Sequence, residues 1–178
     1  MKKPSEDIFI GIGSNMSGPK NTSPFETCED ALKVLEQLDL RIISKSNWYS
    51  SAPIPESSQP WYINGIVSIR TSLTPKSLLD LLHKVEQMFG RTREYENSAR
   101  TLDLDLIAYA DIILGWKDVS KKRELIIPHP RMSERGFVLF PLKEIASNWH
   151  HPVSNKSINE LILCLDPAQK VIRLDENS

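Results

Sequence analysis

Residues 101–110 read TLDLDLIAYA, a stretch in which leucine and aspartate alternate before a short apolar run. Alternation with a period of two is typical of a β-strand with one face in the core and the other toward solvent. The leucines would anchor this strand, while Asp103 and Asp105 would project together from the opposite face, about 6.5–7 Å apart. We therefore predict a strand that carries two convergent carboxylates.

The rest of the chain predicts three more strands and two amphipathic helices. The strands are expected at residues 8–13, 40–50 and 63–72, and the helices at about 31–38 and 75–90. The order β-α-β-β-α-β predicts an α+β fold, with a ferredoxin-like βαββαβ core and an antiparallel sheet with helices packed outside. Two shorter helices, at about 137–146 and 157–164, would also pack on the outside.

The composition indicates one soluble domain over residues 1–178, with its core at about 8–165. Of the 178 residues, 40% are hydrophobic and 25% are charged, which is ordinary for a globular protein. A net charge of −1 argues against nucleic acid or a membrane surface as partner. No apolar run approaches the roughly 18 residues of a membrane span, and the N-terminus is too polar for a secretory signal.

Cys28 and Cys164 are the only cysteines, and both lie in apolar helical patterns. We expect two buried free thiols rather than a disulfide. Free thiols are typical of a reducing compartment, so the protein is expected in the cytoplasm.

The two aspartates suggest a metal site. Like charges on one strand face repel, and Mg²⁺ ions that also bind substrate phosphates would compensate that repulsion. Two such ions could share the carboxylates and hold a phosphoryl group in line. The alternative is a strand whose acidic face is merely solvated.

A loop rich in arginine leads into this strand. Arg91, Arg93 and Arg100 lie within ten positions, and guanidinium groups suit phosphate oxygens. Glu94 and Glu96 can instead pair with these arginines, which would make this an ordinary solvated loop. Together, the loop and the aspartates favour a site for a magnesium nucleotide.

Two further clusters carry candidate binding residues. Prolines on either side of His129 would hold it and Arg131 at the rim of a site, although a histidine between prolines is often only structural. Tyr62 and Asn64 share one strand face and can offer a flat wall and an amide to a planar heterocycle. The alternative is a half-buried tyrosine beside a turn asparagine.

These segments together resemble 6-hydroxymethyl-7,8-dihydropterin pyrophosphokinase over about residues 8–146. The resemblance lies in six motifs that occur in order: FIGIGSN, YSSAPIPESSQPWYIN, VEQMFGR, RTLDLDLIAY, IIPHPR and RGFVLFPLKEIA. It implies a monomeric enzyme that binds MgATP and then the pterin. The pterin hydroxyl attacks the β-phosphorus of ATP, which releases AMP and the pterin diphosphate used in folate biosynthesis.

The resemblance also implies residue roles. Asp103 and Asp105 would hold two Mg²⁺ ions, and Arg91 and Arg100 would act on the phosphates as the loop closes. The residues expected to bind ATP are Glu86, Arg91, Arg100, His129 and Arg135. Those expected to line the pterin pocket are Ser51, Ala52, Ile54, Tyr62, Asn64 and Phe137.

The loop before Arg100 departs from the family pattern. The family commonly has a tryptophan and Gly-Pro there, whereas this chain has Glu-Asn-Ser-Ala at 96–99. Tyr95 is a candidate for the aromatic lid over the pterin.

Two other functions fit a strand with paired aspartates. One is a nucleotidyltransferase or glycosyltransferase that uses the same metal chemistry on another acceptor. The other is a ferredoxin-like binding or regulatory domain. Release of AMP only in the presence of the pterin would distinguish the first hypothesis from both.

Overall fold

The computed structural model describes residues 6–38, 40–90, 100–116 and 125–175. Its strands are β1 (Ile8–Ser14), β2 (Arg41–Lys45), β3 (Tyr49–Ser51), β4 (Tyr62–Arg70), β5 (Asp103–Tyr109) and β6 (Val171–Arg173). Its helices are α1 (Pro24–Gln37), α2 (Pro75–Met88), α3 (Gly136–Ile145) and α4 (Ile158–Leu163), with short 3-10 helices at Pro19–Asn21 and Met132–Glu134.

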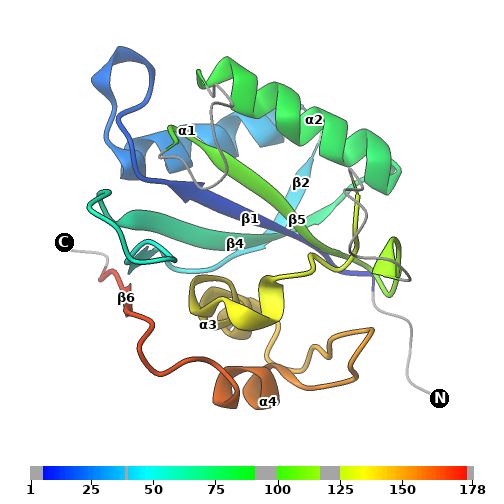
Figure 1. Ribbon diagram of the computed structural model, residues 1–178. Coiled ribbons are helices and arrows are strands. Elements are labelled where there is room, and N and C mark those ends of the chain that lie inside the picture. The colour runs from blue at the N-terminus through cyan, green and yellow to red at the C-terminus, as the bar shows by residue number, and fades with distance from the viewer. Residues whose placement is uncertain (1–5, 39, 91–99, 117–124, 176–178) are drawn as a thin grey trace.

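The strands form one antiparallel sheet in the order β5-β1-β4-β3-β6, with β2 also paired to β4 (Figure 1). The helices α1 and α2 cover one face of this sheet, and α3 and α4 lie on the other (Figure 1). The predicted α+β class and antiparallel sheet are therefore confirmed. The ferredoxin-like β-α-β-β-α-β order holds for β1, α1, β2, β4, α2 and β5, to which β3 and β6 are added.

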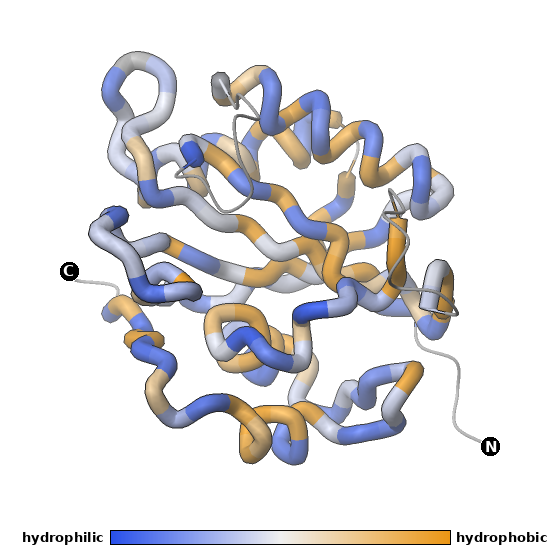
Figure 2. The backbone as a smooth tube through the Cα atoms, in the orientation of Figure 1, coloured by the Kyte–Doolittle hydropathy of each residue, from blue (hydrophilic) through white to orange (hydrophobic). Residues whose placement is uncertain are grey.

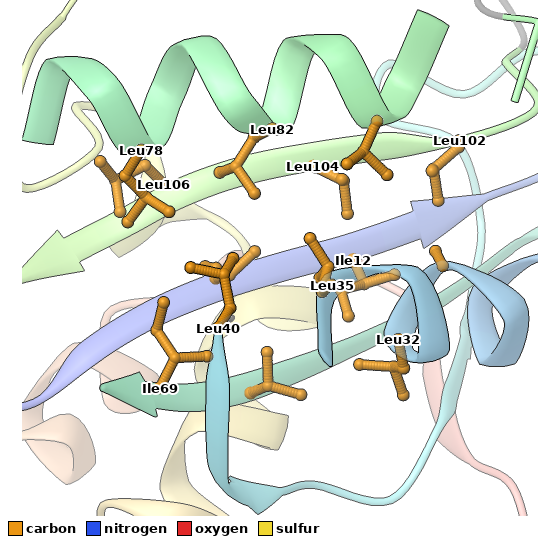
Figure 3. Packing of buried hydrophobic residues seen from close by; sticks show 14 of the residues in the cluster. Ile12, Leu32, Leu35, Leu40, Ile69, Leu78, Leu82, Leu102, Leu104 and Leu106 are labelled. Carbon is orange, nitrogen blue, oxygen red and sulfur yellow. The ribbon is translucent and has the colours of Figure 1, made fainter. Parts of the chain in front are cut away.

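The alternating pattern of β5 has the predicted result. Leu102, Leu104 and Leu106 are buried in the core cluster beneath α2, beside Leu78 and Leu82 (Figure 3). Among the described residues, hydrophobic positions concentrate on the central strands and the inward sides of the helices (Figure 2). This packing fixes which face of β5 remains for chemistry.

The helices begin where local signals place them. Ser23 forms a capping box with Glu26 at the start of α1. Thr74 accepts a hydrogen bond from Ser77 N, and Pro75 is the first residue of α2. Because α1 starts at Pro24, it is longer at its N-terminus than the apolar pattern at 31–38 predicted.

The single strand predicted at 40–50 is two strands, β2 and β3. The pairing with β4 shifts between Ile42 and Ser44, and the chain then bends so that the Trp48 ring is buried. Gly65 of β4 has no side chain, and the Trp48 ring occupies the space beside it. The bend follows from this contact, which no local pattern encodes.

One prediction about the cysteines is wrong. Cys28 is buried in α1, and its burial raises the pKa of the thiol far above its usual range. Cys164 is exposed, because it caps a helix of six residues that buries only Ile158 and Leu161. Both thiols are free, as predicted. Within the described residues, no helix has the length and hydrophobicity needed to cross a membrane.

Candidate active site

The two aspartates of β5 lie opposite glycines of the neighbouring strand β1. Asp103 lies opposite Gly13 of β1 and Asp105 lies opposite Gly11. On the other side of β1, Asn64 of β4 also lies opposite Gly13. Because Gly13, which lies between Asp103 and Asn64, has no side chain, open space remains between the Asp103 carboxylate and the Asn64 amide.

A cavity of about 350 Å³ opens on this face and gathers most of the residues predicted to bind substrates. Its lining includes the predicted residues Ser51, Ala52, Ile54, Tyr62, Asn64, Arg100, Asp103, Asp105, His129, Arg135 and Phe137. They come from β3 and the segment after it, from β4, from β5 and Arg100 before it, and from the segment between β5 and α3 together with the first turn of α3. A volume of this size suits small-molecule ligands.

Each aspartate is paired with an arginine. Arg100 Nη1 lies 2.8 Å from Asp103 Oδ2, and Arg135 Nη1 lies 3.4 Å from Asp105 Oδ2. Burial opposes the charged form of Arg100, but the neighbouring Asp103 prevails and raises its pKa. The aspartate side chains remain 23% and 34% exposed toward the cavity, so these pairs do not seal them off.

His129 is positioned by the outer edge of β5. Its backbone N–H donates to Ile107 O at 2.8 Å, which extends the sheet pattern beyond the strand. Its Nδ1 accepts from Arg131 N at 3.2 Å. Burial lowers the pKa of His129, although Asp105 opposes this. The ring is therefore neutral near pH 7, with its proton on Nε2.

The opposite side of the cavity is built around an amide and two aromatic rings. The Asn64 side chain is buried, and its Nδ2 donates to Ser51 Oγ at 2.9 Å, which fixes the amide plane. Tyr62 lies two residues earlier on the same strand, and Phe137 lies in the first turn of α3. The Arg135 guanidinium lies 5.4 Å from the centroid of the Phe137 ring and links this side to Asp105.

The donor set fits magnesium better than a transition metal. Among the described residues, no three His, Cys, Asp or Glu side chains group as a metal cage. Two carboxylates facing an open cavity leave most coordination positions to water and phosphate oxygens. Mg²⁺ typically binds in this way.

Of the predicted nucleotide-binding residues, Glu86 does not line the cavity and Arg91 cannot be placed relative to it. Glu86 is only 1% exposed, and its Oε1 accepts from Leu104 N at 2.8 Å. It lies under β5 because α2 packs its apolar face there, and it does not line the cavity. Arg91 lies outside the described residues, as do Arg93 and the candidate lid residue Tyr95.

The structure adds lining residues that sequence reasoning missed. Gly13 and Glu134 both line the cavity, and so does Ser57 in the segment after β3. In sequence, Gly13 belongs to the apolar pattern of β1. It could have been recognised as a cavity residue only from its position between Asp103 and Asn64 in the sheet. Glu134 lies close to the predicted Arg135, which was the only available signal.

Three comparisons place the chain among known proteins. The family model described as 7,8-dihydro-6-hydroxymethylpterin-pyrophosphokinase (HPPK) matches residues 9–147. A 2-amino-4-hydroxy-6-hydroxymethyldihydropteridine pyrophosphokinase from Synechocystis is 48% identical over 88% of this chain and 75% of its own length. One from Haemophilus influenzae is 37% identical over 86% of this chain and 89% of its own.

A solved structure supports the fold. The HPPK-DHPS protein of Plasmodium falciparum, in its A437G form, superposes with a TM-score of 0.65 at 16% identity. The match covers 90% of this chain, which spans 45% of that longer chain. At this identity the likeness concerns the fold alone.

Proposed function

Since the chain belongs to the 7,8-dihydro-6-hydroxymethylpterin-pyrophosphokinase family, and is thus an ATP-dependent diphosphokinase of folate biosynthesis, we propose that the cavity described above is its active site. Family membership sets aside the hypotheses of another metal-dependent transferase and of a binding domain. The observation that carries the proposal is the convergence in one cavity of the paired aspartates, two arginines, an amide and two aromatic rings.

We assign the acidic side of the cavity to the ATP phosphates. Asp103 and Asp105 would hold Mg²⁺, which neutralises phosphate charge and orients the triphosphate. With magnesium on the carboxylates, the guanidinium groups of Arg100 and Arg135 can turn to phosphate oxygens at little electrostatic cost. Until substrate arrives, the ion pairs with the aspartates hold both guanidinium groups in place beside the cavity.

His129 would bind the nucleotide without adding charge. Its lowered pKa keeps the ring neutral, and the hydrogen bond from Arg131 N to Nδ1 leaves Nε2–H as the donor. A neutral donor suits a phosphate or ribose oxygen. Its attachment to the edge of β5 keeps this donor at a fixed distance from Asp105.

The aromatic side would bind the pterin. Tyr62 and Phe137 offer ring faces to a flat heterocycle, and the Asn64 amide can read its edge. Ser51, Ala52 and Ile54 would complete the wall on the side of β3. The pterin hydroxyl oxygen would then form a new bond to the β-phosphorus. The bond between the β-phosphorus and the oxygen that links it to the α-phosphorus breaks, so AMP leaves with that oxygen, and the hydroxyl proton passes to solvent.

The decisive experiment is product analysis with purified protein, ATP, Mg²⁺ and 6-hydroxymethyl-7,8-dihydropterin. AMP and the pterin diphosphate should form in equal amounts, and neither should form when the pterin is omitted. Chelation of Mg²⁺ should abolish both products. Formation of ADP, or AMP release independent of the pterin, would contradict the proposed reaction.

A further inference from the structure

Asn15 is a buried polar residue that does not line the cavity and that the mechanism above does not use. It directly follows β1, and its side chain is 2% exposed. A buried amide must find partners for its oxygen and its two N–H groups. The partners of Asn15 lie in two segments that are far apart in sequence and that each contribute a residue to the cavity lining, Gln59 and Arg100.

One set of partners is the backbone of Arg100. Asn15 Oδ1 accepts from Arg100 N at 2.9 Å, and Asn15 N donates to Arg100 O at 3.2 Å. Both polar groups of the Arg100 backbone are therefore held by one residue. This attachment fixes the point from which the Arg100 side chain reaches Asp103.

The other set of partners precedes β4. Asn15 Nδ2 donates to Gln59 Oε1 and to Pro60 O, both at 3.2 Å. Gln59 Oε1 also accepts from the Tyr62 hydroxyl at 3.1 Å. Asn15 thus holds the segment that leads into β4. Its amide also shares the acceptor Gln59 Oε1 with the hydroxyl of Tyr62, one of the two aromatic residues of the cavity.

We propose that Asn15 is a positioning residue that fixes the distance between the phosphate side and the pterin side of the site. An unbroken series of hydrogen bonds runs from the Tyr62 hydroxyl through Gln59 and Asn15 to the Arg100 backbone, and the Arg100 side chain then pairs with Asp103. Because transfer needs the pterin oxygen in line with the β-phosphorus, a small change in this distance lowers the rate. This inference rests on the proposed function.

Two variants separate the effects of the two sets of hydrogen bonds that Asn15 makes. Asn15→Asp keeps an oxygen for Arg100 N–H but sets a second oxygen against the two acceptors, Gln59 Oε1 and Pro60 O. It should raise the KM for the pterin about fivefold or more and leave the KM for ATP within about twofold. Asn15→Ala removes the side-chain bonds to both segments and leaves only the backbone bond from residue 15 N to Arg100 O. It should, in addition, lower kcat about tenfold, because Arg100 N loses its acceptor.

Pterin affinity measured by calorimetry with a non-hydrolysable ATP analogue gives a readout that does not depend on turnover. It should fall by a similar factor in Asn15→Asp. The matched control is Ser46→Ala, which removes a buried hydroxyl that also bonds two backbone groups but lies outside the cavity lining. It should lower the melting temperature without changing either KM.

The outcomes separate the two claims. If the wild-type protein releases no AMP, the proposed function fails. If it turns over but Asn15→Asp binds both substrates as the wild type does, or binds ATP and the pterin more weakly by the same factor, then Asn15 only stabilises the fold and the inference is wrong.

Discussion

Asp103 and Asp105 are each paired with a guanidinium and partly exposed to the cavity, which determines what their substitution should do. Asp103→Asn and Asp105→Asn keep the shape of each side chain but remove the charge that would hold Mg²⁺. Turnover should fall at least about 100-fold, because metal and phosphate charge stabilisation are lost together. Steady-state AMP release at saturating substrates measures this.

The fold should survive these substitutions. Partly exposed ion pairs contribute little to stability, so the melting temperature should change by only a few degrees. A scan of thermal unfolding by circular dichroism checks this. Near-wild-type turnover in either folded variant would count against the magnesium assignment.

Pairs of residues on one strand face could be predicted from sequence, and contacts between strands could not. The shared faces of Asp103 with Asp105, and of Tyr62 with Asn64, follow from the period of a single strand. The position of Gly13 between Asp103 and Asn64 depends on the registers of β1 with both neighbours. A register of this kind follows from packing of the whole sheet.

Among the elements, β4 holds the sheet together, because it pairs with three other strands, β1, β2 and β3. The Trp48 ring packs against it, and a Cβ added at Gly65 would lie 2.6 Å from two atoms of that ring. Gly65→Ala should therefore destabilise the protein by about 1–3 kcal/mol, because the buried indole must shift. Urea unfolding followed by tryptophan fluorescence measures the change.

Gly13→Ala is the control for this prediction. Apart from its neighbours in the chain, the nearest atom to a Cβ at Gly13 would be Asn64 Oδ1, at 3.3 Å. Its free energy of unfolding should be closer to that of the wild type. Equal losses in both variants would show that the cost is a general one for glycine in a strand and not the contact with Trp48.

The elements predicted correctly are those with a strong local period. The apolar face of α2 and the alternation of β5 each repeat over several turns or residue pairs, so they outweigh errors at single positions. The three residues of β6 carry no such repeat, and Ile172 and Arg173 are exposed. β6 exists because its backbone pairs with β3, which lies about 120 positions earlier in the sequence.

Across the whole molecule, the face of the sheet that bears α3 and α4 has a second core in which one histidine is buried. The His151 ring lies 5.9 Å from the Trp149 ring and 5.7 Å from the Trp116 ring, centroid to centroid. Its Nδ1 accepts from Val153 N and Ser154 N, each at 3.3 Å. Trp116 Nε1 in turn donates to Pro128 O, next to His129, so this cluster supports one wall of the site.

This cluster should make stability depend on pH. Burial lowers the pKa of His151 in the folded protein, whereas in the unfolded chain it should lie near its ordinary value of about 6.5. Below that value the unfolded chain binds a proton that the folded protein does not, so the free energy of unfolding falls as pH decreases. The slope from this one group is at most about 1.4 kcal/mol per pH unit, and it ends below the folded pKa.

The variant His151→Asn isolates this effect, because an asparagine oxygen can accept from backbone N–H groups two and three residues later and does not titrate. Urea unfolding between pH 5 and pH 7.5 should show a shallower loss of stability in the variant than in the wild type. His129 has a pKa shifted in the same direction but is present in both proteins, so its contribution cancels in the difference. Parallel curves for the two proteins would mean that the pKa of His151 is the same in the folded and the unfolded protein, so that its protonation is not linked to unfolding.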